Sequence, residues 1–163
     1  MRITIQPADA ADLKIVEKFI SDGFDAQVAK DFQIAGRVGF RMYGARRALA
    51  DRIKAGAGAY VALDGETGRP VGYLEMRGRG AARDPNGRDH ITLLFVDLDF
   101  QRQGIARQLL AKAIELARAC GHPDITINAS RHAKPIYARL GFVAEQTAVD
   151  QDGFIFTPMR LKF

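Results

Sequence analysis

The chain of 163 residues has the length of one domain, and its 47% hydrophobic and 26% charged residues exclude fibrous and intrinsically disordered proteins. One cysteine, Cys120, excludes an internal disulfide, and no apolar run approaches the about 20 residues that span a bilayer. The net charge of +5 arises in one segment, residues 30–54, and the basic and acidic residues of the remaining chain balance. We expect a single domain over residues 1–163 that acts in a reducing cytoplasm without a membrane partner.

The first half of the chain predicts a strand, helices and a hairpin. Ile3 and Ile5 alternate with polar residues, as in a strand. A helical repeat of apolar residues follows, and a second helical region continues to Ile53. Two strands over residues 60–63 and 70–76 then form the expected hairpin. A polar loop comes next, and its residues 84–87 (Asp-Pro-Asn-Gly) predict a turn.

The helical region holds the basic segment, with seven basic and two acidic side chains over residues 30–54. Such a segment can bind nucleic acid, an anionic cofactor or an acidic partner. No base-stacking aromatic pattern accompanies it. Apolar residues recur beneath the arginines at helical spacing, namely Met42, Ala45, Leu49 and Ile53. We therefore interpret the segment as the solvated face of a helix and expect no nucleic-acid partner.

The second half alternates strands and helices. Residues 90–96 are almost continuously apolar, which is typical of a central strand buried on both faces. The remaining expected elements are a helix over 104–120, a strand over 124–128, a short helix over 130–140 and a closing hairpin of 142–144 with 154–156. This order of elements predicts an α/β (α+β) fold.

The junction between the central strand and the next helix has the composition of a phosphate site. A polar loop follows Val96, and glycine stands at the start of the helix. Unpaired backbone N–H groups and the positive end of a helix dipole bind phosphate there. Neither a P-loop nor a Rossmann glycine pattern is present. The junction alone is also compatible with an ordinary strand–helix turn.

Two motifs together resemble the GNAT N-acetyltransferase superfamily. The first is Gln101-x-x-Gly104-x-Ala106, which resembles the pyrophosphate loop of that family. The second lies in residues 130–142, where Ala133 stands four residues before Tyr137 and Leu-Gly-Phe follows. The specific motifs cover residues 90–163, whereas the N-terminal half agrees only in the order of its strands and helices.

The resemblance implies a mixed, mostly antiparallel sheet flanked by helices, with a splayed strand pair that forms an acyl-CoA cleft. The cosubstrate would be acetyl-CoA, whose pantetheine arm pairs with the strand backbone near Phe95 and Val96. A backbone N–H near Val96 would polarise the thioester carbonyl. The residues expected to hold the pyrophosphate are Gln101, Arg102, Gln103, Gly104, Ile105 and Ala106. Asn128 would bind pantetheine or substrate, or make a local turn contact.

The resemblance also suggests how protons move. Tyr137 matches the family's general acid, and a phenol stays protonated at neutral pH. The acidic residue that many relatives use as general base is replaced here by Leu93. Glu75, His90 or a water chain would take its place. Alternatively, Glu75 is an exposed strand carboxylate and His90 a structural histidine at the strand end. The histidines are too scattered for a metal site, so we expect no metal.

The expected activity is acetyl transfer to a primary amine of a small molecule or peptide. Phe32, Phe40 and Tyr43 would line the acceptor pocket, or else pack in the core. Two other functions stay open, namely a toxin that acetylates aminoacyl-tRNA and a regulatory module that binds acyl-CoA without turnover. The exact acceptor, the acyl chain length and the oligomeric state are not predicted, and a homodimer stays open.

Overall fold

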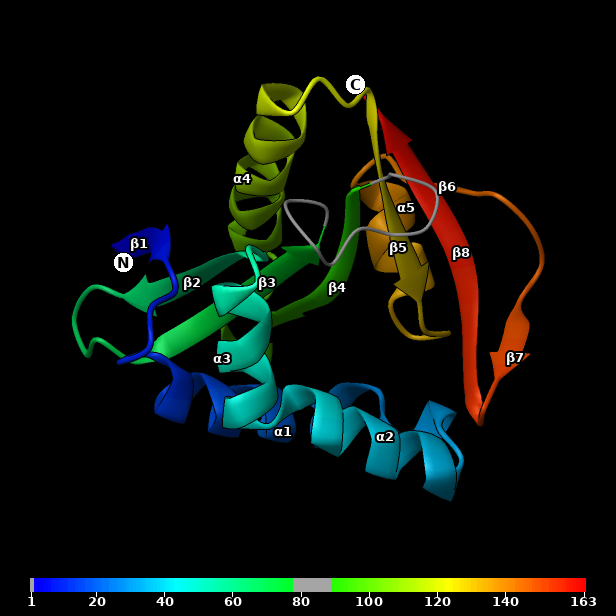
Figure 1. The fold of residues 1–163 in the computed structure, drawn as a ribbon, viewed down its shortest axis with the longest axis horizontal. Helices are drawn as coiled ribbons and strands as arrows, with labels where there is room; N and C mark the ends of the chain where they lie inside the picture. Colours follow the sequence, from blue (N-terminus) through cyan, green and yellow to red (C-terminus); the bar gives the residue numbers. More distant parts are fainter. Residues whose placement is uncertain (1, 78–88) are drawn as a thin grey trace.

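The computed structural model describes residues 2–77 and 89–163, and the turn expected at residues 84–87 lies outside them. The strands are β1 (Ile3–Pro7), β2 (Gly58–Asp64), β3 (Pro70–Arg77), β4 (Asp89–Val96), β5 (Asp124–Ala129), β6 (Val143–Ala144), β7 (Val149–Gln151) and β8 (Phe154–Lys162). The helices are α1 (Leu13–Gln27), α2 (Ile34–Gly44), α3 (Arg46–Lys54), α4 (Ile105–Ala119) and α5 (Lys134–Arg139), with 3-10 turns η1 (Ala29–Asp31) and η2 (Leu98–Phe100). Figure 1 shows their arrangement.

A mixed sheet forms the centre of the molecule, as expected. Its order is β1-β2-β3-β4-β5-β8-β6, and β7 pairs with β8. The strand pairs are antiparallel apart from β4 with β5, which is parallel. The apolar faces of α4 and α5 cover one side, where they pack on the buried residues of β3, β4 and β5. The apolar faces of α1 and α3 cover the other side.

The two central strands separate along their length, which confirms the expected splayed pair. The register of β4 with β5 extends only from Asp89 to Ile91 on β4. Beyond that point β4 keeps β3 as its neighbour up to Val96, while β5 stays paired with β8, its partner along its whole length (Figure 1). One edge of the second half of β4 is therefore not covered by another strand. The expected burial on both faces is incomplete there, and Thr92, Leu94 and Val96 are only half-buried.

The closing hairpin differs from its prediction. Residues 154–156 pair with β7, not with residues 142–144. β6 pairs instead with the far end of β8, at Met159 and Arg160. The tight turn lies at Asp152 and Gly153, which both adopt positive φ angles of 53° and 83°. A chain reversal this tight joins adjacent strands, so the apolar residues 142–144 reach β8 only through the longer segment that includes β7.

The basic segment also departs from its prediction, because it is not one helix. Ala45 is extended (φ −63°, ψ 142°) and separates α2 from α3. The break turns Met42 outward, where it is 70% exposed, while Leu49 is fully buried as expected. The outer face of α2 carries two more exposed apolar side chains, Ile34 and Val38. In the described part of the chain, no helix has the length and apolarity that a membrane span needs.

Candidate active site

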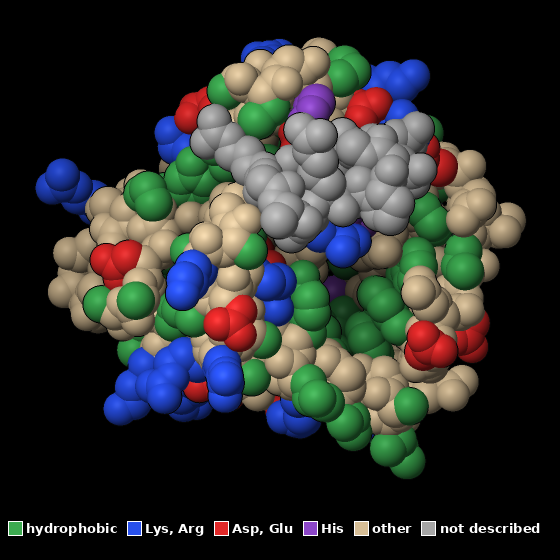
Figure 2. Space-filling model, viewed as in Figure 1, with side chains coloured by type: hydrophobic (Ala, Val, Ile, Leu, Met, Phe, Trp, Pro, Cys, Tyr) green, Lys and Arg blue, Asp and Glu red, His purple; other side chains and the backbone are tan. Residues whose placement is uncertain are grey.

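A cavity of about 1320 Å³ opens at the splay of β4 and β5. It is lined by the second half of β4, the start of α4, α5, one face of α2 and the β7–β8 hairpin. Figure 2 shows its mouth as a hollow above α2, with hydrophobic side chains in its depth. The cavity brings together segments from both ends of the chain, including the two motifs singled out in the sequence.

Most of the residues expected to bind the cosubstrate border this cavity. They are Phe95, Val96, Gln101, Arg102, Gly104, Ile105, Ala106 and Asn128. Gln103 does not border it, and its side-chain amide donates to the carbonyl of Asp99 instead (3.3 Å). The cavity therefore gathers the residues of the loop motif with one exception.

The loop before α4 has the backbone form of an anion site. Arg102 and Gly104 have positive φ angles of 64° and 82°, which turn the chain sharply into the helix. The first helical hydrogen bond runs from the N–H of Gln108 to the carbonyl of Gly104 (3.0 Å). The N–H groups of the residues between them therefore lack acceptors within the helix and lie at the positive end of a 15-residue helix dipole.

The open edge of β4 ends in a polar cluster. The N–H of Asp97 points to β3 and donates to Val71 (3.0 Å), so alternation puts the N–H and carbonyl of Val96 on the open edge. That carbonyl accepts from the side-chain amides of Gln27 (3.1 Å) and Gln101 (3.3 Å). Sequence reasoning missed Gln27, because nothing in the sequence indicates that the end of α1 meets the end of β4.

Tyr137 borders the cavity from α5 and is 8% exposed. Its ring packs against Phe142 with the centroids 5.9 Å apart. Burial raises the pKa of its phenol well above the usual value. The helix is positioned by Ser130, whose hydroxyl accepts from the N–H of Ala133 (3.2 Å). Tyr137 therefore presents a protonated phenol beside the cavity at neutral pH.

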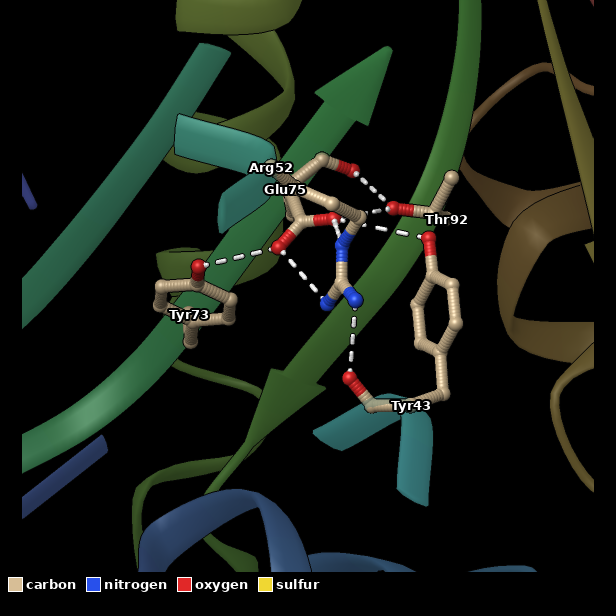
Figure 3. Close-up of polar contacts among 5 residues, drawn as sticks. All are labelled: Tyr43, Arg52, Tyr73, Glu75 and Thr92. Atoms are coloured by element: carbon tan, nitrogen blue, oxygen red, sulfur yellow. Dashed lines mark hydrogen bonds and ion pairs between the residues drawn. The ribbon is translucent and has the colours of Figure 1, made fainter. Parts of the chain in front are cut away.

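Glu75 lies behind the cavity wall, in the network that Figure 3 shows. Its carboxylate is fully buried and pairs with both Nε (2.6 Å) and a terminal nitrogen (3.2 Å) of Arg52. Three hydroxyls also donate to it, those of Thr92 (3.0 Å), Tyr73 (3.3 Å) and Tyr43 (3.5 Å). Glu75 does not border the cavity, whereas Thr92 and Tyr43 do. Among the described residues, its carboxylate therefore reaches the cavity through their hydroxyls.

Arg52 joins this network to α2. Its guanidinium lies 3.6 Å from the centroid of the Tyr43 ring and donates to the Tyr43 carbonyl (2.9 Å). Burial is the main cause that raises the pKa values of Tyr43 and Tyr73, so both phenols are neutral donors. Sequence reasoning assigned Arg52 to a solvated helix face, which is wrong because the α2–α3 break points it at the sheet.

His90 borders the cavity at the start of β4 and is 9% exposed. Its Nδ1 lies 2.8 Å from the hydroxyl of Thr126. The adjacent Asp89 pairs with His122 Nδ1 (2.8 Å), a contact that sequence reasoning did not anticipate. Within residues 2–77 and 89–163, no cluster of three or more histidine, cysteine or carboxylate side chains is arranged to hold a metal ion.

The expected acceptor residues Phe32, Phe40 and Tyr43 all border the cavity. Phe32 is also part of the core, where it stacks on Phe154 with the centroids 4.5 Å apart. Phe40 stacks on Phe24 at 4.0 Å. The sequence left core packing and pocket lining as alternatives for these residues. The rings of Phe32 and Phe40 do both.

Comparison with known proteins identifies the family. The family model described as an acetyltransferase (GNAT) domain matches residues 28–163. The chain belongs to the GNAT acetyltransferase family. In Escherichia coli (strain K12), the uncharacterized N-acetyltransferase YafP is 33% identical over 75 residues, which are 45% of this chain and 47% of YafP. The chain thus matches about half the length of this curated relative.

Solved GNAT structures share the whole fold. A GCN5-related N-acetyltransferase from Rhodopseudomonas palustris is 22% identical with a TM-score of 0.79, over 100% of this chain and 97% of its own. PaiA N-acetyltransferase from Thermoplasma acidophilum, in complex with coenzyme A, is 17% identical with a TM-score of 0.79 over 100% of both chains. YncA from Salmonella typhimurium, with acetyl-CoA, is 20% identical with a TM-score of 0.67, over 99% of this chain and 94% of YncA. These likenesses confirm the expected fold.

Proposed function

We propose that this acetyltransferase moves an acetyl group from acetyl-CoA to a primary amine of a small molecule or peptide, by direct attack in a ternary complex. The observation that carries the proposal is the single cavity that joins the open edge of β4, the start of α4 and the phenol of Tyr137. The coenzyme A and acetyl-CoA bound by PaiA and YncA, which share the fold, support acetyl-CoA as the cosubstrate.

In the proposed complex the pyrophosphate lies on the free N–H groups at the start of α4. The guanidinium groups of Arg102 and Arg107, which border the cavity there, add positive charge. The pantetheine arm runs along the open edge of β4 by Phe95 and Val96, with Asn128 across the splay. Binding there displaces the amides of Gln27 and Gln101 from the Val96 carbonyl, or uses them as donors.

The chemical step forms one C–N bond and breaks one C–S bond. The amine attacks the thioester carbon, and the N–H of Val96 stabilises the oxyanion. When the intermediate collapses, the phenol of Tyr137 gives its proton to the departing CoA thiolate. The attacking nitrogen loses one proton to a base. Holding the amine against the thioester supplies most of the rate, so no covalent enzyme intermediate is needed.

For the base we propose Glu75, reached through Thr92. Glu75 lies opposite Leu93 in the β3–β4 register, beside the position where many relatives carry an acid. The Thr92 hydroxyl takes the proton from nitrogen and passes its own to Glu75 Oε1, 3.0 Å away. His90 is the other candidate, since it borders the cavity directly.

Thr92→Val separates these two candidates. Valine keeps the shape but removes the relay, so we expect kcat to fall about 100-fold while His90→Gln changes it little. Steady-state kinetics at pH 7 with acetyl-CoA and a reactive amine measures both variants. If kcat fell in His90→Gln and stayed normal in Thr92→Val, the result would assign the base to His90.

Gly104→Ala tests the cosubstrate site. A Cβ at Gly104 meets nothing within 4 Å, so the change acts through its positive φ angle of 82°. Straightening the turn moves the N–H groups of α4, and we expect acetyl-CoA affinity to fall about tenfold by titration calorimetry. Gly121→Ala is the control, because Gly121 has a φ of 75°, equally open surroundings and no place on the cavity. Gly121→Ala should lower the Tm about as much as Gly104→Ala and leave the affinity for acetyl-CoA unchanged. Equal losses of acetyl-CoA affinity in the two variants would contradict the proposed site.

A direct assay tests the function as a whole. We expect calorimetry of the folded protein to show acetyl-CoA binding, and an amine panel to give CoA thiol release with an acetylated product by mass spectrometry. Binding without release over the whole panel would favour a regulatory module. Absence of binding would refute the proposed function.

A further inference from the structure

The acceptor side of the cavity has an aromatic wall. On the sheet face covered by α1 to α3, the cavity is bordered by Phe32, Phe40, Tyr43, Phe95 and Phe154. The rings of Phe32 and Phe154 stack, and Phe40 meets Phe95 edge to face at 5.9 Å. These contacts hold the rings in place without a ligand. Such a wall favours a flat aromatic or branched apolar body.

The charges that border the cavity are mainly positive. Among the described residues that line it, the arginines are Arg77, Arg102, Arg107 and Arg139, and the carboxylate is that of Asp152. Asp152 is exposed on the β7–β8 turn. Glu75 adds no free negative charge, because Arg52 pairs with it and three hydroxyls surround it. In the proposed complex Arg102 and Arg107 face the pyrophosphate, which leaves Arg77 and Arg139 as the cavity's other arginines. A second ammonium group on an acceptor would therefore meet these arginines or aromatic surface, with few carboxylates to pair it.

Two glycines of α2 give the wall its shape. A Cβ at Gly36 would lie 2.6 Å from the carbonyl oxygen of Gly153, so glycine lets α2 pack directly on the β7–β8 turn. The N–H of Gln33 donates to that same carbonyl (3.0 Å). A Cβ at Gly39 would meet nothing within 4 Å, and Gly39 borders the cavity. The backbone of α2 is therefore held close to the hairpin, while open space remains at Gly39.

From this geometry we propose that the acceptor is a monoamine with an uncharged aromatic or branched apolar body, which lies along the α2 wall at Gly39. Polycationic amines are poor acceptors. This inference rests on the proposed function and names the substrate class of the same site. The reacting nitrogen lies beside Thr92, and the apolar body contacts the aromatic wall.

Two amines of similar shape test the charge preference. The first is 2-cyclohexylethylamine, and the second is 1-(2-aminoethyl)piperazine, which carries a second positive charge. With acetyl-CoA at saturation, we expect kcat/KM for the first to exceed that for the second by about 100-fold. Phenethylamine should match the first amine, and spermidine the second. Equal or higher values for the charged amines would overturn the proposal.

Gly39→Leu tests the location. The leucine side chain would fill the open space on the wall, so we expect KM for phenethylamine to rise about tenfold with acetyl-CoA affinity unchanged. The Tm should not fall, since leucine favours a helix over glycine. Val38→Leu, on the outer face of α2, is the matched control and should leave KM unchanged. A Gly39→Leu enzyme with normal KM would overturn the location.

The outcomes separate this inference from the function beneath it. Acetyl-CoA binding with acetylation of spermidine but not of phenethylamine would refute the acceptor class and leave the proposed function standing. Binding without acetylation of any of the four amines would also refute the acceptor class. Absence of acetyl-CoA binding to the folded protein would refute both.

Discussion

Tyr137→Phe should lower kcat by about 10²- to 10⁴-fold, the range for loss of a general acid. Phenylalanine keeps the packing on Phe142 and removes only the hydroxyl. The CoA thiolate then has to leave without a proton from this position. The affinity for acetyl-CoA should stay unchanged, because the proposed contacts with pyrophosphate and pantetheine come from α4 and β4. Single-turnover kinetics and calorimetry measure the two quantities separately.

The proposed acid role of Tyr137 also predicts how the wild-type rate depends on pH. Burial raises the pKa of the Tyr137 phenol, so the protonated form that acts as acid persists well above neutral pH. The wild-type rate should therefore show no alkaline loss from this group below about pH 10, the usual pKa of tyrosine.

Tyr60→Phe is the control for Tyr137→Phe, since Tyr60 lies on β2 and does not border the cavity, and it should keep normal turnover. Normal turnover in Tyr137→Phe would remove the acid role.

Arg52→Met should destabilise the protein by about 3–5 kcal/mol, which is typical when one partner of a buried ion pair is removed. The change leaves the Glu75 carboxylate without its cation in a fully buried position. It also removes the contacts of Arg52 with the ring and carbonyl of Tyr43. Urea unfolding followed by circular dichroism measures the free energy of unfolding.

Two further variants test whether the loss of stability in Arg52→Met comes from the unpaired Glu75 carboxylate. Arg47→Met, an exposed site on the same helix, should change the free energy of unfolding by less than about 0.5 kcal/mol. Adding Glu75→Gln to Arg52→Met should recover part of the stability, since the buried charge is then gone, and the double-mutant cycle gives the coupling. If Arg52→Met lowered the free energy of unfolding no more than Arg47→Met does, the Arg52–Glu75 ion pair would not be a principal source of stability.

Local patterns predicted the backbone form of the loop before α4 and of the helix that carries Tyr137. The loop before α4 and the helix with Tyr137 each depend on a short run of contiguous residues, so their backbone form follows from local sequence. The apolar run of β4 likewise predicted a central strand, and the neighbouring strands over residues 60–63 and 70–76 predicted the β2–β3 hairpin. The register of β6 could not be predicted, because residues 142–144 suit several partners and only packing selects Met159 and Arg160.

The aromatic wall of the cavity and the Glu75 network behind it depended on contacts between distant segments. Glu75 was expected as a possible base or an exposed strand carboxylate, and the exposed alternative is wrong because α3 folds over it and supplies Arg52. The break at Ala45 directs α3 so that Arg52 reaches Glu75. The same break leaves Met42 exposed, although helical spacing predicted it to be buried. Helical periodicity alone gives no signal for such a break, since the apolar spacing continues through it.

The sequence by itself determined the family, the place of most strands and helices, and the chain turn between Val96 and Ala106 that exposes backbone donors. These features are local, so neighbouring residues are enough to specify them. Tertiary structure alone decided which aromatic side chains line the cavity, how Arg52 pairs with Glu75 and how closely α2 approaches Gly153. Those properties arise where segments tens of residues apart pack together, and the free energy that selects them comes from the whole core.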